Sequence, residues 1–344
     1  MHRLGASLVG FPLLVLAGAG CSASGGADTT ATATSETGTE DTAGTEDTTG
    51  TEDTGATTSE TGDGDGDGDG DGDGDGDGDG DPRDTPCGPI NDPVPGKVVV
   101  WCDDFDGPKI DATKWEFEVN GQGGGNNELQ YYTDRPENAR VENGLLIIEA
   151  REETYTGPDG TRDYTSARLR TLNKGDWTHG RFEMRGKLPS GTGLWPAFWM
   201  LPTDWVYGGW AASGEIDIVE LIGQDPDIVY GTLHFGGPWP DNTSSANTTA
   251  WGEHSYVLNG ATFNDDFHVF AIEWEANEIR WYVDGVHYQT QTEWYSTAAR
   301  YPAPFDQPFH FIANVAVGGN WPGSPNGTTS FPQQFQIDWV RVFQ

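Results

Sequence analysis

The sequence predicts an all-β fold for most of the chain, an antiparallel β-sandwich or barrel. Short alternating or apolar runs follow one another from Val98 onward and are separated by Gly, Pro, Asn and Asp residues. β-Branched and aromatic residues are frequent in these runs, and Asp284-Gly285 is typical of a hairpin turn. No stretch shows the sustained 3.6-residue periodicity of an amphipathic helix. We therefore expect strands joined by short turns.

Eight runs have the length and residue composition of β-strands. They are Lys97–Trp101, Leu145–Ala150, Arg181–Lys187, Val229–Phe235, Phe267–Trp274, Glu278–Val283, Phe309–Val317 and Phe335–Phe343. The chain also holds 14 tryptophans, and several stand in or beside Gly/Pro-rich segments between these runs. Aromatic rings in loops or at strand ends are suited to stacking on the apolar faces of sugar rings.

The N-terminus has the composition of an export signal over residues 1–21. His2 and Arg3 are followed by an apolar run that is too short to span a bilayer, and small residues precede Cys21. Cys21 resembles the acylated cysteine of a bacterial lipoprotein, which would anchor the protein to the outer membrane or cell surface. The alternative is cleavage and release into the medium. We expect no other contact with a membrane.

Residues 22–85 have the composition of a disordered acidic linker. Thr/Glu/Asp repeats and strict Asp-Gly repeats provide hardly any large apolar side chain to offset the entropy lost on ordering the backbone. These repeats also hold a large share of the formal net charge of -37. Residues 86–344 form the predicted folded domain and carry no basic stripe, which argues against nucleic acid as a partner. We expect a monomer.

Cys87 and Cys102 remain as an even pair in an exported chain if Cys21 carries a lipid. A disulfide between them would tie the start of the folded domain to its first strand. We expect a structural bond rather than a reactive thiol.

Three acidic residues alternate with β-branched residues in the segment Gly214–Glu220. In a regular strand Glu215 and Asp217 share one face, whereas Glu220 points to the other. A β-bulge near Ile218-Val219 would return Glu220 to the first face, and bulges often occur beside active sites. The two glutamate Cα atoms would then be roughly 13 Å apart, which leaves on the order of 5 Å between inward-leaning carboxyl groups. That separation is typical of retaining glycosidases.

Two other interpretations of this segment are a solvated acidic face and a metal site. Ile216, Ile218 and Val219 are typical of a strand whose other face is buried, which disfavours a fully solvated strand. A metal site is disfavoured because no second His or Cys stands with His234 at ligand spacing.

The sequence resembles glycoside hydrolase family 16, and specifically its bacterial laminarinase-like branch, from about residue 98 to the end. The bulged Glu-x-Asp-x-x-Glu spacing is a signature of that branch, and further matching segments follow in the order of the family. They are Asn126–Tyr132, Ser166–Thr171, Gly180–Glu183, Gly193–Leu201, Gly231–Phe235, Asn314–Pro322 and Asp338–Val342. The resemblance implies a β-jelly-roll sandwich of two curved antiparallel sheets, with a substrate cleft on the concave face.

By this resemblance Glu215 is the nucleophile, Asp217 its helper and Glu220 the general acid/base of a retaining double displacement. The family also lines its cleft with aromatic and polar side chains. The matching residues are Trp195, Trp199 and Trp210 as sugar-stacking walls, and Asn126, Arg170, His234 and Trp321 elsewhere in the cleft. The alternatives are an internal ion pair for Arg170 and a purely structural strand position for His234.

Many members of the family bind a structural calcium ion on the convex side. The matching positions are Asp104 and Gly144, through backbone carbonyl oxygens, and the aspartate Asp338. Any such ion would stabilise the fold, and no cofactor is implied for catalysis.

The resemblance favours endo-hydrolysis of a β-1,3-glucan such as laminarin. The retained Trp195–Trp199 segment and Asn126–Glu128 loop support this polysaccharide substrate. Mixed-linkage β-1,3-1,4-glucan or an algal galactan would use the same mechanism, and the bulged spacing is compatible with both. A surface carbohydrate-binding module without activity is a third alternative, but the three intact acids count against it.

Overall fold

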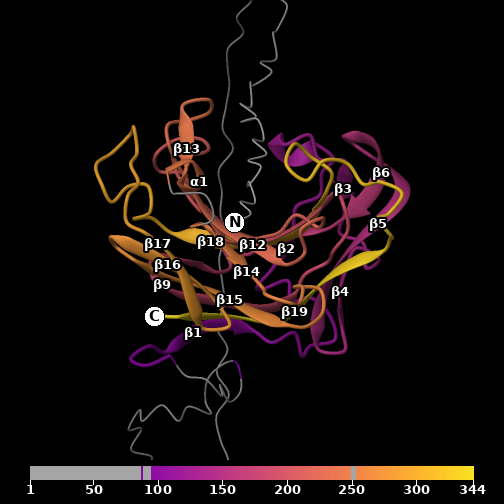
Figure 1. Cartoon of the computed structure of the whole chain (residues 1–344), viewed down its shortest axis with the longest axis horizontal. Helices are drawn as coiled ribbons and strands as arrows, with labels where there is room; N and C mark the ends of the chain where they lie inside the picture. Colours follow the sequence, from indigo (N-terminus) through magenta and orange to yellow (C-terminus); the bar gives the residue numbers. More distant parts are fainter. Residues whose placement is uncertain (1–86, 88–93, 249–252) are drawn as a thin grey trace, which may run out of the picture. The chain divides into compact units, whose positions relative to one another are not determined.

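Two β-sheets packed face to face make up most of the described chain (Figure 1). The structure is a computed structural model that describes residues 87, 94–248 and 253–344. The predicted export signal and linker lie outside these residues, so the proposed domain boundaries stay predictions. No helix within the described ranges is long and apolar enough to cross a membrane.

The first sheet has ten strands within the described residues. They are β1 Val99–Asp103, β3 Gln130–Tyr132, β4 Ala139–Glu142, β5 Leu145–Gly157, β6 Gly160–Ser166, β9 Gly180–Lys187, β15 His268–Glu275, β16 Glu278–Val283, β17 Val286–Gln291 and β19 Gln333–Phe343. Their order is β17-β16-β15-β9-β19-β5-β6-β3, with β1 beside β19 and β4 beside β5. Only β3 and β6 pair in parallel among these described strands.

The second sheet has nine strands in the same part of the chain. They are β2 Glu116–Phe117, β7 Arg168–Arg170, β8 Asp176–Trp177, β10 Leu194–Pro202, β11 Glu215–Glu220, β12 Ile228–Gly236, β13 Asn242–Ser244, β14 Ser255–Val257 and β18 Phe309–Val317. The order is β13-β12-β11-β10-β18-β7-β2, with β14 beside β12 and β8 beside β18. Two short helices, the 3-10 helix Gly123–Gly125 and α1 Ser245–Thr248, lie outside the sheets.

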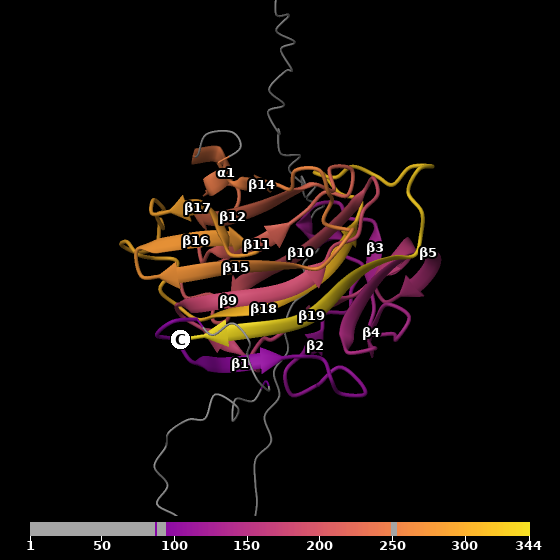
Figure 2. The same cartoon turned by 60° about the horizontal axis from the view of Figure 1, so that its bottom comes forward.

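The hydrophobic core lies between the two sheets, which Figure 2 shows as layers with β9, β15 and β19 in front of β10 and β11. Phe311 of β18 packs against Phe182 of the first sheet and Phe198 of the second, with ring centroids 5.8 Å and 4.8 Å apart. All three rings are fully buried, and each contributes about 1.5–3 kcal/mol of hydrophobic stabilisation. The second sheet therefore has one face in the core and one face that can carry the side chains of a functional site.

The structure confirms the predicted all-β sandwich and contains a strand at each of the eight predicted runs. The sequence pattern missed β10, because Gly193 and Pro196 are residue types that usually interrupt strands. Trp199 consequently lies within a central strand and not in a loop or at a strand end.

Cys87 and Cys102 form the predicted disulfide, with Cα atoms 5.9 Å apart. Both residues are buried, and Cys102 belongs to β1. The bond therefore ties the beginning of the described chain to the first sheet.

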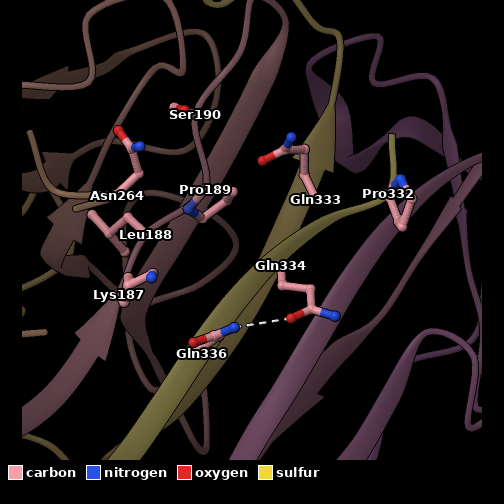
Figure 3. A pocket seen from close by; sticks show the side chains of 9 residues that line it. All are labelled: Lys187, Leu188, Pro189, Ser190, Asn264, Pro332, Gln333, Gln334 and Gln336. Atoms are coloured by element: carbon pink, nitrogen blue, oxygen red, sulfur yellow. Dashed lines mark hydrogen bonds between the residues drawn. The ribbon is translucent and has the colours of Figure 1, made fainter. Parts of the chain in front are cut away.

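A pocket of about 240 Å³ lies at the first sheet, beside β9 and β19 (Figure 3). Four of its nine lining residues carry amide side chains, and Gln336 Nε2 donates a hydrogen bond to Gln334 Oε1 over 2.9 Å. Lys187 and Asn264 approach from the other side. None of the three predicted catalytic acids lines this pocket, because all three lie on β11 of the second sheet.

Candidate active site

β11 places the three predicted acids on one face of the second sheet because it contains the predicted β-bulge. Between Asp217 and Glu220 the register with β12 shifts by one residue, and the register with β10 shifts at the same place. The three acids therefore lie opposite alternate residues of β12, namely His234, Thr232 and Tyr230. Directly opposed residues of an antiparallel pair share a face, so all three carboxylates share one.

The opposite face of β11 is buried in the core. Ile216, Ile218 and Val219 are all at most 2% exposed and pack between the sheets. Asp217 is itself only 2% exposed. The structure therefore excludes a solvated acidic strand.

Two tryptophans orient the two glutamates. Trp210 Nε1 donates a hydrogen bond to Glu215 Oε2 over 2.8 Å, and Trp195 Nε1 donates one to Glu220 Oε1 over 3.0 Å. Each indole binds one oxygen of its carboxylate and leaves the other available. The two carboxylates are thus held in fixed orientations and each keeps a reactive oxygen.

His234 lies beside Glu215 and Asp217 on the neighbouring strand. Its Nε2 atom is 3.6 Å from Glu215 Oε1 and 3.4 Å from Asp217 Oδ2. The imidazole also packs on Trp210, with ring centroids 5.5 Å apart. The structure therefore places His234 beside two of the three acids.

Burial and mutual repulsion favour protonated carboxyl groups in this site. Burial, the charge of Glu215 and a side-chain hydrogen bond with Glu215 raise the pKa of Asp217 well above its usual value. Burial also raises the pKa of Glu220 strongly, and the charges of Asp217 and Glu215 raise it further. His234 and the Trp195 hydrogen bond act in the opposite direction and lower that pKa. A carboxyl group that holds its proton near neutral pH can serve as a general acid.

Aromatic side chains extend from the acids across the sheet. Trp199 lies opposite Asp217 on β10. Trp321 is 40% exposed and meets both Trp195 and Tyr230 edge to face, with centroids 5.4 Å and 5.2 Å apart. Partly exposed aromatic rings around the acids are suited to stacking on sugar rings.

Asn126 and Arg170 are held by other protein groups. The carbonyl of Asn126 accepts a hydrogen bond from Asn320 N over 2.8 Å, which joins its loop to the one that bears Trp321. Arg170 donates to Glu116 Oε1 over 2.7 Å and to Glu118 Oε1 over 2.8 Å. Arg170 also lies three strands from β11. Its contacts are therefore those of the internal ion pair that was the alternative to a role in the cleft.

Comparisons with known proteins agree with this geometry. Residues 126–341 match the model of the glycosyl hydrolases family 16. The chain belongs to this family. The beta-glucanase of Rhodothermus marinus is 47% identical over 262 residues, which cover 74% of this chain and 87% of that protein. Glucan endo-1,3-beta-glucosidase A1 of Niallia circulans is 43% identical over 280 residues, which cover 76% of this chain but 40% of that longer protein.

A crystal structure of the laminarinase catalytic domain from Thermotoga maritima is also similar, with 43% identity and a TM-score of 0.63. The superposition covers 72% of this chain and 98% of that domain. The protein is therefore a glycoside hydrolase with the jelly-roll fold that its sequence predicted.

The structure of this family 16 glycoside hydrolase adds two residues that the sequence interpretation missed. The guanidinium of Arg168 lies 4.7 Å from the ring centroid of Trp199. Asn314 Oδ1 accepts a hydrogen bond from Trp199 Nε1 over 2.8 Å. The alternation in Arg168-Leu169-Arg170 could have indicated Arg168, because residues two apart on a strand share a face. Asn314 gave no comparable signal.

The three predicted calcium positions of this hydrolase come together along β19. Asp104 follows β1, whose Asp103 pairs with Val340, and Gly144 lies in the turn before β5, which also pairs with β19. Oxygen donors of this kind fit calcium. However, the Asp338 carboxylate forms an ion pair with Arg185 Nη1, whose positive charge would compete with a cation. The donor set therefore fits the ion only in part.

Proposed function

We propose that this glycoside hydrolase is an endo-acting β-1,3-glucanase that works by a retaining double displacement. The observation that carries the proposal is the bulge in β11, which puts Glu215 and Glu220 on one face with an indole N–H on each. The similarity to a glucan endo-1,3-beta-glucosidase and to a laminarinase domain supports β-1,3-glucan as the substrate.

In the proposed first step Glu220 gives its proton to the glycosidic oxygen while Glu215 attacks the anomeric carbon. The bond between that carbon and the leaving oxygen breaks, and a covalent glycosyl-enzyme forms. Glu220, now ionised, then takes a proton from water as the water oxygen attacks the same carbon and releases Glu215. Asp217 shares a hydrogen bond with Glu215 and would stabilise its charge on release.

Trp195, Trp199, Trp210 and Trp321 support the proposed binding of a sugar chain across this face. Trp195 and Trp210 touch the two glutamates directly, so sugars stacked on them would lie at the cleaved bond. Trp199 lies opposite Asp217 on the neighbouring strand and Trp321 packs against Trp195, so these two rings would hold neighbouring sugars.

Reducing-sugar release from laminarin, lichenan and agarose tests the function. We expect the highest kcat/KM on laminarin, with oligosaccharides of several lengths among the early products because cleavage is internal. A higher kcat/KM on lichenan or agarose would favour the mixed-linkage or galactan alternative. Binding of laminarin without release of reducing ends would indicate a carbohydrate-binding module. Glu215→Gln serves as the inactive control.

We also propose a lipid anchor at Cys21 and a structural calcium ion at Asp104, Gly144 and Asp338. The anchor is supported by the apolar run and small residues before Cys21, which lie outside the described residues. The calcium ion is supported by the oxygen donors that gather along β19.

A further inference from the structure

We propose that the active site binds a divalent transition-metal ion such as Zn²⁺ between Glu215, Asp217 and His234, and that this ion inhibits the enzyme. Each of these residues offers one ligand atom, and the three atoms lie within 4.8 Å of one another. The sequence alone disfavoured a metal site, because no second His or Cys stands with His234 at ligand spacing. Ligands that come from two different strands, however, need not be closely spaced along the chain. The pairing of Glu215 with His234 across β11 and β12 brings them together.

The two distances from His234 to the acids are close to those of a tetrahedral zinc site. Zinc binds imidazole nitrogen and carboxylate oxygen at about 2.0–2.2 Å, so two ligands of one tetrahedral ion lie roughly 3.3–3.5 Å apart. His234 Nε2 is 3.4 Å from Asp217 Oδ2 and 3.6 Å from Glu215 Oε1. Small side-chain rotations would therefore suffice to close the site around an ion.

A buried oxygen without a hydrogen-bond donor points into this site. The Asp217 side chain is only 3% exposed, and no described residue donates a hydrogen bond to its Oδ2 atom. A buried acceptor without a partner is costly, and a cation would satisfy it. Trp210 Nε1 binds Glu215 Oε2, so a zinc ion would bind the Oε1 atom in place of the hydrogen bond that Glu215 shares with Asp217.

The ligand set selects zinc over the common hard cations. One imidazole nitrogen and two carboxylate oxygens complete three positions of a tetrahedron and leave the fourth for water, as in many zinc sites. Magnesium requires an octahedron of oxygens and calcium takes six to eight. We therefore expect Zn²⁺ to bind at this site, and we expect no binding of Mg²⁺ or Ca²⁺ there.

The inhibitory effect rests on the proposed function, because it follows from the role of Glu215 as nucleophile. A carboxylate that is bound to zinc cannot attack the anomeric carbon, and the ion occupies space that the sugar needs. We expect Zn²⁺ to raise the apparent KM for laminarin in proportion to its concentration, and EDTA to restore the original value.

Isothermal titration of Zn²⁺ into the metal-free, untagged protein tests the site independently of activity. His234→Gln should weaken binding at least about tenfold, since loss of even an outer partner of a metal ligand costs 10–100-fold. His268→Gln is the matched control, because His268 pairs with one carboxylate, Asp284, over 2.7 Å on the first sheet. Glu215→Gln should weaken binding as well and provides a second variant if His234→Gln fails to fold.

Equal Zn²⁺ affinity in the parent protein, His234→Gln and Glu215→Gln would overturn the proposed site, as would the absence of measurable binding. If His234→Gln weakened Zn²⁺ binding but Zn²⁺ did not slow laminarin hydrolysis by the parent enzyme, the proposed inhibition would be overturned and the proposed binding site would stand. A protein that binds Zn²⁺ at these residues but hydrolyses none of the three polysaccharides would instead refute the proposed function.

Discussion

Trp199 Nε1 donates a hydrogen bond to Asn314 Oδ1 over 2.8 Å, which joins β10 to β18 on the acid-bearing face. Asn314 is buried, and its Nδ2 donates to Tyr132 Oη over 3.1 Å. Tyr132 donates in turn to Glu128 Oε2 over 3.3 Å. The orientation of the Trp199 ring thus depends on a chain of hydrogen bonds that ends in the loop before β3.

Replacing Asn314 by leucine, which has a similar volume, should lower the free energy of unfolding by about 1–3 kcal/mol. The indole N–H of Trp199 would lose its acceptor, and the buried hydroxyl of Tyr132 would lose the donor Asn314 Nδ2 while keeping Glu128. KM for laminarin should rise more than kcat falls, because Trp199 is proposed to hold sugar rather than to take part in the chemistry. Urea unfolding and steady-state kinetics measure both effects.

The exposed Asn277 in the turn between β15 and β16 provides the matched control for this substitution. Asn277→Leu should change stability by no more than about 0.5 kcal/mol. If Asn314→Leu behaved like Asn277→Leu in both measurements, the hydrogen-bond chain would have no role in holding Trp199.

The two glutamates should give different products when azide replaces water and the substrate carries an activated leaving group. In Glu220→Ala the covalent intermediate still forms, and azide attack on it gives the β-glycosyl azide. In Glu215→Ala azide can enter the vacated space and displace the leaving group once, which gives the α-glycosyl azide. Proton NMR of the anomeric position distinguishes them. Exchanged products would show that the proposed roles of the two residues are reversed.

The sequence was sufficient to predict the bulge in β11, because face parity is a local property of a strand. Glu215 and Asp217 share a face by their even spacing, and Glu220 joins them only if one residue is extra. The alternating and apolar runs likewise predicted eight of the strands, although not the central strand β10. Both inferences need only a few consecutive residues.

Contacts between distant segments were beyond the reach of these patterns. Asn314 and Tyr132 are separated by 182 positions in the sequence, and no local periodicity indicates that they meet. The same holds for Arg170, whose partners Glu116 and Glu118 come from β2 and the residue after it. Such residues gain their roles from strand order, which local spacing does not determine.

Calcium should raise the thermal unfolding midpoint of the enzyme without changing kcat. An ion that binds only the folded state adds free energy of unfolding, and each kcal/mol corresponds to roughly 2–4 °C in a domain of this size. Asp338→Asn should abolish the difference between calcium and EDTA in differential scanning fluorimetry. Asp176→Asn, at an exposed position of the second sheet, should retain it. A midpoint that does not respond to calcium in the parent protein would refute the structural ion.

Replacing Cys21 by serine should move the enzyme from the membrane fraction to the medium or the soluble fraction of the producing bacterium. Lipid attachment requires the cysteine thiol, and no other anchor is predicted. Incorporation of a labelled fatty acid measures the attachment directly. Unchanged fractionation of Cys21→Ser together with unlabelled parent protein would instead support ordinary cleavage and secretion.

The basic limb of the kcat/KM profile should follow the protonation of Glu220, because the first step needs its proton. Activity is then lost as the pH rises through the pKa of Glu220. Asp217→Asn removes a negative charge that raises this pKa, so the limb should move to lower pH. Trp195→Phe removes a hydrogen bond that favours the ionised form, so the limb should move to higher pH.

Opposite displacements of the basic limb in the two variants would show that Asp217 and Trp195 both act on the pKa of Glu220. A general loss of structure would not move the limb in opposite directions. Trp339→Phe, on the first sheet, should leave the limb in place. Profiles measured with a soluble β-1,3-gluco-oligosaccharide avoid changes in polymer solubility. If the basic limb moved in the same direction in Asp217→Asn and in Trp195→Phe, a group other than Glu220 would donate the proton, because the two substitutions should have opposite effects on the pKa of Glu220.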